Sequence, residues 1–250
     1  MNDSQTIEKM KEMKLYGMAR AMASAVEMGI DGVTPDEFLA HLVDAEYDDR
    51  HERRFKRLFK AARFRYKASM EEIDFTQDRN LSKNLFLRFS DCAFIKERKD
   101  ITITGPSGSG KSFLSSALGS QACVYGFRTF YFNLSKLFSQ LKLAKADGSY
   151  IARMEKIERA PLLILDDFGL QQLDTASRLI FLELLEDRHS IRSTIITSQL
   201  PVSAWHEVIG DPTIADAICD RVINNSYRIE LKGDSLRRRF KKGDGNGNIK

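Results

Sequence analysis

The sequence predicts an α/β domain with about five mostly parallel strands, preceded by a small all-α domain. From Asp100 onward, short apolar segments alternate with helical patterns, and this alternation requires crossover connections between parallel strands. Before about Asp74, apolar residues recur only at helical spacing. A chain of 250 residues that is 42% hydrophobic and 30% charged has the composition of a globular protein with a sizeable core.

The helical domain is expected to span residues 1–75. Apolar side chains at helical spacing predict one amphipathic helix, and we interpret its methionine-rich stripe as a packing surface, with a partner-binding face as the alternative. A second helix is predicted to follow Thr34 as its N-cap, because Pro35 takes the first helical position and Glu37 stands three residues after the cap. The apolar positions of the first helix are Met10, Met13, Leu15, Met18, Met22 and Val26.

The α/β core is expected to span residues 76–232, with helices on both faces of the sheet in an αβα sandwich. It begins where a polar stretch at 76–80 interrupts the helical pattern. The basic, Gly- and Asn-rich tail at 233–250 is expected to be too short for a C-terminal helical lid domain. The expected strands are Ile101–Thr104, Thr129–Phe132, Leu162–Leu165, Thr194–Thr197 and Tyr227–Leu231.

A phosphate-binding loop follows the first expected strand. Residues 105–112 read GPSGSGKS and match G-x-x-x-x-G-K-[ST] between a strand and a helix, which is the context that this motif requires. Its glycines let backbone N–H groups converge on phosphate oxygens, Lys111 supplies a positive charge, and the Ser112 hydroxyl is a Mg²⁺ ligand. A glycine-rich turn without a ligand is the structural alternative. The expected ATP-binding residues are Gly105, Pro106, Ser107, Gly108, Ser109, Gly110, Lys111, Ser112 and Phe113.

Two acids end the apolar strand expected at 162–165. Carboxylates at the carboxyl end of a buried strand are costly unless they face a cation or a cleft, and α/β sheets bind ligands at this edge. We therefore expect Asp166 to hold Mg²⁺ together with Ser112. We expect Asp167 to orient or deprotonate the attacking water, with a cap for the following turn as the structural alternative.

Several classes of protein are disfavoured by residue usage. The longest apolar run, residues 160–165, is far too short to cross a bilayer, and the N-terminal residues lack the pattern of a secretory signal. The three cysteines form no CxxC pair, and the four histidines show no metal-binding spacing. We expect a cytoplasmic protein with reduced thiols, no membrane partner and no structural zinc site.

A basic segment precedes the core. Between Arg50 and Lys67 there are nine basic residues and one acid, and on a helix they form a basic face opposite an apolar one. Such a face is either a solvated surface or a contact for a polyanion such as DNA, and the family resemblance described below favours binding to the phosphates of duplex DNA. A second basic cluster at 237–242 is either a further phosphate contact or a solubilising tail. The expected DNA-binding residues are Arg50, Arg53, Arg54, Lys56, Arg57, Lys60 and Arg63.

The order of these motifs resembles the AAA+ ATPases, in the branch that holds the IstB-type transposition helper proteins and the DnaC/DnaI-type helicase loaders. The phosphate loop, the acids after residue 165, TSQ at 197–199 and DR at 220–221 carry the resemblance, together with GDSLR at 233–237. In the N-terminal part, MKLYGMA at 13–19 is similar to IstB-type sequences. The resemblance implies an ATP-hydrolysing oligomer that binds and remodels duplex DNA and acts with a partner transposase.

The same resemblance assigns further catalytic roles. It implies that Gln199 is the sensor-1 residue, that Arg221 is an arginine finger donated in trans to a neighbouring subunit, and that Arg237 is the sensor-2 arginine. The sequence departs from the common AAA+ pattern at three positions, with Ser112 in place of Thr, Asp167 in place of Glu and Gln199 in place of Asn. The shorter reach of Asp167 favours slow turnover, so that ATP acts chiefly as an assembly switch.

Other functions remain compatible with the sequence. A replicative helicase loader of the DnaC/DnaI type would share the core but would bind a helicase and favour single strands. A P-loop kinase would need an acceptor pocket and would turn over ATP without DNA. A DNA-architectural protein with a degenerate nucleotide site would bind DNA equally with and without nucleotide.

Overall fold

The computed structural model describes residues 3–29, 32–76 and 79–233, and the chain divides into two compact units, Met1–Arg57 and Leu58–Lys250. This division lies before the expected boundary at 75/76. The reason is that Ala68 and Ile73 are buried in the same apolar cluster as Ile101 of the sheet, so this stretch packs as part of the α/β unit. The expected tail beyond Gly233 lies outside the described residues.

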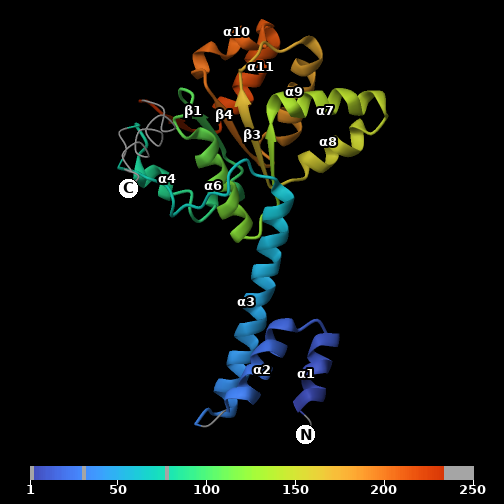
Figure 1. The fold of residues 1–250 in the computed structure, drawn as a ribbon. Coiled ribbons are helices and arrows are strands. Elements are labelled where there is room, and N and C mark those ends of the chain that lie inside the picture. The colour runs from blue at the N-terminus through green and yellow to red at the C-terminus, as the bar shows by residue number, and fades with distance from the viewer. Residues whose placement is uncertain (1–2, 30–31, 77–78, 234–250) are drawn as a thin grey trace, which may run out of the picture. The chain divides into compact units, whose positions relative to one another are not determined.

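The first unit contains α1 (Asp3–Glu12), α2 (Tyr16–Met28) and the larger part of α3 (Pro35–Ala62) (Figure 1). The single helix expected from Met10 to Val26 was wrong, because the chain turns between α1 and α2. Lys14 adopts a left-handed conformation with φ +60°, and the N–H of Leu15 reaches back to the carbonyl of Met10 at 2.8 Å. This pattern ends a helix by satisfying its last carbonyls.

The expected start of the next helix is confirmed. The hydroxyl of Thr34 accepts the N–H of Glu37 at 3.3 Å, and the Glu37 carboxylate accepts the N–H of Thr34 at 2.9 Å. Two backbone donors that a helix end leaves unpaired are satisfied in this way. The side chain of Thr34 and its partner Glu37 therefore fix the first residue of α3.

The packing of α2 on α3 depends on Gly17. A Cβ at this residue would lie 2.2 Å from the backbone oxygen of Ala45, so only glycine permits the close approach. The buried carboxylate of Glu46 then accepts the N–H of Gly17 at 2.8 Å and that of Met18 at 3.4 Å. An anion at the amino end of α2 is favourable, because the first N–H groups of a helix lack partners within it.

The second unit is built on a five-stranded sheet in which every pair of neighbouring strands is parallel, with the order β2-β3-β4-β1-β5. Their bounds match the expected strands to within a few residues and confirm the α/β fold. Because all strands run the same way, their carboxyl ends lie at one edge. The strands are β1 (Asp100–Thr104), β2 (Thr129–Asn133), β3 (Leu162–Phe168), β4 (Ser193–Ser198) and β5 (Ser226–Glu230).

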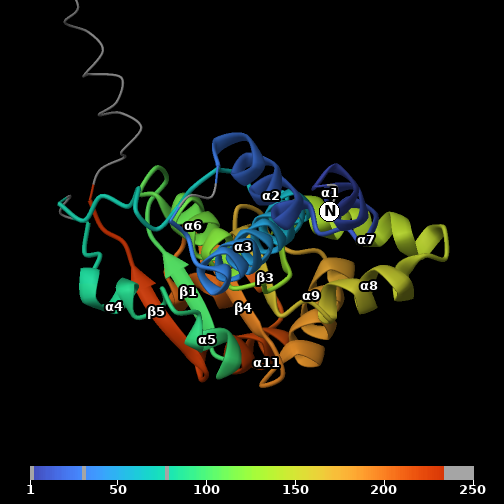
Figure 2. The ribbon, with the colours of Figure 1, turned by 90° about the horizontal axis from the view of Figure 1, so that it is seen from below.

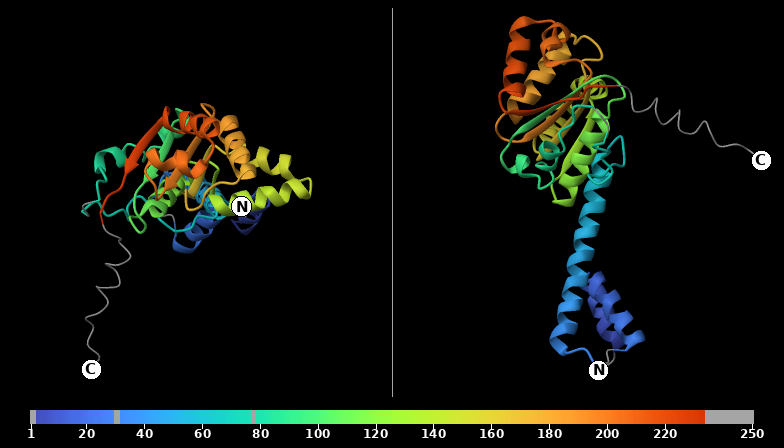
Figure 3. Two further views of the ribbon diagram at one scale, coloured as in Figure 1. Left: turned by 90° about the horizontal axis from the view of Figure 1, so that it is seen from above. Right: turned by 90° about the vertical axis from the view of Figure 1, so that its left-hand side faces the viewer.

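Helices cover both faces of the sheet, as Figure 2 shows from below, and the hairpin of α7 and α8 is also visible in Figure 3. Alternate residues of β3 serve the two layers, with Ile164 in the cluster beneath α6 and Leu163 in the cluster that packs on α7, α9 and α11. The helices and the short 3-10 turn η1 are α4 (Lys83–Leu87), α5 (Ala93–Lys96), α6 (Lys111–Val124), α7 (Leu134–Ala146), α8 (Tyr150–Glu158), α9 (Thr175–Arg188), η1 (Val202–Ala204), α10 (Trp205–Ile209) and α11 (Pro212–Ile223).

At the amino edge of the sheet, a buried arginine joins several elements. The Arg188 guanidinium donates to the carbonyl oxygens of Ile157 at 3.1 Å and Ala160 at 2.9 Å, and to the hydroxyl of Thr194 at 3.0 Å. Burial lowers the pKa of Arg188 to about 10. Beside it, the Asp100 carboxyl accepts the N–H of Thr194 at 2.6 Å, and burial raises the pKa of Asp100 to about 7.

The three cysteines are buried. Cys92, Cys123 and Cys219 form no disulfide, and burial raises the pKa of Cys123 to about 11. Within the described ranges, no group of three or more His, Cys, Asp or Glu side chains is arranged to hold a metal ion. Among the same residues, no helix has the length and apolar character needed to span a membrane.

The Gly17→Ala substitution is expected to destabilise the first unit. The added methyl group must displace the backbone of α3, and overpacking of this kind costs about 1–3 kcal/mol. The measurement is hydrogen exchange of the α2 amides in the full chain, which should become faster in the variant. Ser24→Ala, at an exposed position of the same helix, is the control and should leave exchange nearly unchanged. Equal exchange in Gly17→Ala and the wild type would contradict the close packing.

Asp100 is expected to make stability depend on pH. Because its pKa is raised in the folded state to about 7, the folded chain holds this proton more tightly than the unfolded chain. The resulting stabilisation is complete below the unfolded pKa and is lost as the pH rises through about 7, with a slope of at most about 1.4 kcal/mol per pH unit. Urea unfolding between about pH 5 and 8 should show this decline in the wild type, and Asp100→Asn should lack it. Parallel pH profiles for the two proteins would refute the assignment.

Candidate nucleotide-binding site

The phosphate loop joins β1 to α6 in a backbone conformation that requires glycine. Gly105, Gly108 and Gly110 have φ values of +148°, +83° and +97°, which L side chains rarely adopt. A Cβ at Gly105 would also lie 2.6 Å from the carbonyl oxygen of Leu231. The loop therefore has the shape that the motif predicts, with α6 beginning directly after it at Lys111.

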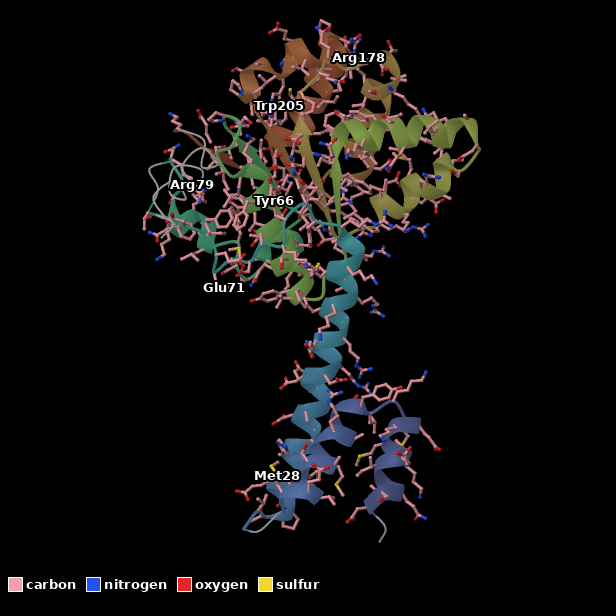
Figure 4. All side chains as sticks on the ribbon, viewed as in Figure 1. Met28, Tyr66, Glu71, Arg79, Arg178 and Trp205 are labelled. Atoms are coloured by element: carbon pink, nitrogen blue, oxygen red, sulfur yellow. The ribbon has the colours of Figure 1, made fainter. Side chains whose placement is uncertain are left out.

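Two cations hold the loop. The buried Lys111 ammonium donates to the carbonyl oxygens of Gly105 at 2.7 Å and Pro106 at 2.8 Å, which keeps its charge within the loop. Arg79, labelled in Figure 4, is also buried and donates to the carbonyl oxygen of Ser109 at 3.3 Å. The hydroxyl of Ser109 is buried without a partner among the described residues. Positive charge and an unused polar group at this loop fit a phosphate ligand.

Beneath the loop, Asp166 is fully buried and is surrounded by hydroxyl groups. Ser112 donates to its carboxylate at 2.9 Å, and the hydroxyls of Tyr131 and Thr197 also donate to it. Burial, with the nearby Asp166 charge, raises the pKa of Tyr131, so this phenol is a stable donor. The structure thus joins Ser112 and Asp166 as expected. A hydroxyl and a carboxylate are the oxygen donors that Mg²⁺ prefers, so these residues fit that ion.

Asp167 has a different environment from its neighbour. Its φ of +64° is left-handed, and the register of β3 against β4 shifts between Leu165 and Phe168. Its N–H donates to the Thr197 hydroxyl at 3.1 Å, while its carboxylate accepts the side-chain amide of Asn133 at 3.1 Å. The backbone of Asp167 is thus tied to β4 and its carboxylate to β2, while its role with the attacking water stays a prediction.

Several residues of this site were not expected from the sequence. Tyr131 and Asn133 alternate along β2, and Asn133 lies opposite Asp166 in the register of the sheet. Polar residues at the carboxyl end of an expected strand were the available signal for both. Arg65 had been counted only within the basic run, yet it donates to Asp167 at 2.9 Å across 102 positions of sequence. No local pattern reveals such a contact.

Of the residues to which the family resemblance assigns sensor and arginine-finger roles, Gln199 and Arg221 lie towards opposite edges of the sheet. Gln199 follows β4 at the same edge of the sheet as the phosphate loop, and its sensor role stays a prediction. Arg221 lies near the end of α11, towards the amino edge, and its guanidinium binds Glu186 at 2.5 Å and the carbonyl of Ala217 at 2.9 Å. It is therefore not part of this chain's own phosphate site. Arg237 lies outside the described residues.

The expected DNA-binding residues fall into two groups. All except Arg63 belong to α3, which confirms the helix but leaves DNA contact untested. Arg50 and Arg53 pair with the buried carboxylates of Glu46 and Asp49, at 2.6 Å and 2.5 Å, respectively. Lys56 pairs with Glu52 at 2.6 Å. No acidic partner within residues 3–29, 32–76 and 79–233 is found for Arg57, Lys60 and Arg63.

Comparison with solved structures identifies proteins of similar fold. The chain is similar to DnaI, with a TM-score of 0.57 and 21% identity over 70% of this chain and 93% of that one. It is also similar to the DnaC helicase loader, with a TM-score of 0.53 and 21% identity over 71% and 99% of the two chains. A DnaA from Aquifex aeolicus bound to AMPPCP gives a TM-score of 0.59 at 16% identity, over 75% of this chain and 58% of that one. The expected AAA+ P-loop fold is confirmed.

Comparison of sequences extends beyond the fold. The protein y4pL of Sinorhizobium fredii, whose name describes an insertion sequence ATP-binding protein, is 42% identical over 234 residues, which cover 93% of this chain and 96% of that protein. A protein of Pseudomonas fluorescens named for ATP binding in the insertion sequence IS1162 is 36% identical over 81% of this chain and 89% of that protein. A family model described as IstB-like ATP binding protein matches residues 8–243. With its phosphate loop and buried acid in place, the chain belongs to the IstB-like family of ATP-binding proteins.

Proposed function

We propose that the chain is an ATPase that assembles as an oligomer on duplex DNA in the cytosol, remodels that DNA, and helps a partner transposase in DNA transposition. The observation that carries the proposal is the arrangement of Ser112, Asp166 and Asp167 at the phosphate loop. The relatives named for insertion sequences support the role in transposition.

The residues divide the work of hydrolysis. Lys111 and the loop glycines bind and neutralise the phosphates, while Ser112 and Asp166 would hold Mg²⁺. When bound, this ion would offset the charge that develops on the transferred phosphoryl group. Asp167 then orients the attacking water or accepts its proton. Its shorter side chain, compared with the glutamate common in AAA+ proteins, supports slow turnover and a switch-like use of ATP.

Assembly would complete the site. Arg221 binds Glu186 and the carbonyl oxygen of Ala217 near the amino edge of the sheet, away from this chain's own phosphate loop, and it would have to leave Glu186 to reach a neighbouring subunit's nucleotide. We propose that it acts there as an arginine finger, with Gln199 as sensor 1 and Arg237 as sensor 2. Hydrolysis that needs an arginine in trans depends on oligomerisation.

A helicase loader is the second candidate, because the fold is similar to those of DnaI and DnaC. These structures are only 21% identical to the chain, so they support the shared core and leave the partner open. A loader would bind a helicase and prefer single strands. Duplex preference and capture by a transposase would favour the first proposal.

The proposal is tested by measuring ATP hydrolysis with and without long duplex DNA, while sedimentation reports the size of the complex in the same samples. The wild type should form a large assembly only with ATP and duplex DNA together, and turnover should rise. Lys111→Ala should lose this assembly and about 100-fold or more of the hydrolysis, as expected for the loss of a charge-stabilising donor.

Three outcomes would overturn the proposal. Turnover that is indifferent to DNA in a protein that stays small would point to a phosphoryl acceptor and a kinase. DNA binding that is equal with and without nucleotide would point to an architectural protein. A preference for single strands over duplex DNA would favour the helicase loader.

Arg57 and Lys60, for which no acidic partner is found among the described residues, are expected to dominate DNA affinity. Arg57→Gln with Lys60→Gln should reduce the dependence of log affinity on log salt by about 0.9 for each phosphate that the variant no longer neutralises. Lys56→Gln is the matched control, since its ammonium already pairs with Glu52 and should change the slope less. Fluorescence anisotropy with labelled duplex DNA over a salt series measures these slopes. Equal changes of the salt slope in Lys56→Gln and in the Arg57→Gln, Lys60→Gln variant would contradict this prediction.

A further inference from the structure

Arg65 bridges the two acids of the nucleotide site. Its Nη1 lies 2.9 Å from a carboxylate oxygen of Asp167 and 3.3 Å from one of Asp166. One guanidinium nitrogen therefore faces both carboxylates. Adjacent carboxylates repel each other, and a cation between them removes this repulsion.

The position of Arg65 allows it to move. Its side chain is 41% exposed, whereas the Asp166 side chain is fully buried. The arginine therefore reaches the acids from the solvent side. A divalent ion carries twice the charge of the guanidinium and attracts the two carboxylates more strongly. The guanidinium can leave without opening the core.

Neighbours on both sides fix the segment that carries Arg65. The ring of Phe64 packs against α6, where a Cβ at Gly119 would lie 2.4 Å from it. Tyr66, labelled in Figure 4, has its ring centroid 6.2 Å from that of Phe113, directly after the phosphate loop. Arg65 itself stacks over Tyr66 at 5.7 Å. The aromatic residues aim the intervening guanidinium at the acids.

We propose that Arg65 is a positioning residue that competes with Mg²⁺ for Asp166 and Asp167. It acts as the counter-cation of these acids until the metal binds with nucleotide, and it is then displaced. This inference rests on the proposed function, because it takes Ser112 and Asp166 as the metal site. Ser112 donates to Oδ1 of Asp166 and Arg65 to Oδ2, so a metal ion held by Ser112 and Asp166 would lie on the same carboxylate as the guanidinium, and the two positive charges would repel each other.

Displacement has a structural consequence. Once Arg65 leaves the acids, residues 63–67 keep the ring contacts of Phe64 and Tyr66 but lose the ion pairs of Arg65 with Asp166 and Asp167 of β3. Metal and nucleotide binding would therefore loosen the stretch that directly follows α3. The Asp167 carboxylate would at the same time lose its contact with the guanidinium.

The test is the affinity for Mn²⁺, a spectroscopic substitute for Mg²⁺, measured by electron paramagnetic resonance with a non-hydrolysable ATP analogue. Arg65→Gln should tighten Mn²⁺ binding about fivefold, the scale of one half-exposed ion pair. Arg65→Lys, which keeps the charge, should stay closer to the wild type. Lys67→Gln, an exposed residue of the same segment, is the control and should have no effect. Unchanged or weaker Mn²⁺ binding by Arg65→Gln would overturn the competition.

A second readout uses the wild type alone and does not depend on how the variants fold. Hydrogen exchange of residues 63–67 should become faster when Mn²⁺ and the analogue are added together, and unchanged or slower exchange would count against displacement.

The Ser112→Ala variant distinguishes failure of the Arg65 proposal from failure of the proposed function. If it weakens Mn²⁺ binding while Arg65→Gln has no effect, the metal site stands and only the role of Arg65 fails. If Ser112→Ala leaves Mn²⁺ binding intact, the metal site of the proposed function fails, and the competition fails with it.

Discussion

The site depends on the hydrogen bonds made to the buried carboxylate of Asp166. This carboxylate accepts hydrogen bonds from hydroxyl groups of α6, β2 and β4, so one side chain connects the phosphate loop to the centre of the sheet. A buried carboxylate without such donors would cost several kcal/mol. The parallel order of the strands brings these donors to one edge. The parallel arrangement of the strands is thus needed to supply hydrogen-bond donors to the buried carboxylate as well as to bury the apolar core.

The sequence identifies those parts of the fold and site that local patterns determine. The alternation of strands and helices predicts the sheet. The glycine spacing predicts the loop, because backbone φ values near +90° at Gly108 and Gly110 are rarely adopted by other residues, so the glycines mark this conformation in the sequence. The break between α1 and α2 was not predicted, because Lys14, a residue with good helix propensity, takes a left-handed conformation there. The contact of Arg65 with Asp166 spans 101 positions and follows from tertiary packing alone.

Charge counting shows a similar limit in α3. The sequence shows a dense basic run, but two of its arginines neutralise buried acids that hold the first unit together. Glu46 both caps α2 and binds Arg50, so this part of the basic run has a structural role. The helix geometry decides which basic residues pair with acids, and this pairing cannot be read from the number of charges in the run.

The environment of Asp167 connects these features to turnover. Its left-handed backbone places the carboxylate between Asn133 of β2 and Arg65, and both donate to the same oxygen. A carboxylate with two donors on one oxygen is less free to orient a water molecule. Its side chain is also one methylene shorter than glutamate, so it cannot easily reach past these partners. Under the proposed role of Arg65, metal binding would remove the charged partner first, so the Asp167 carboxylate would be released only in a nucleotide site that is already loaded.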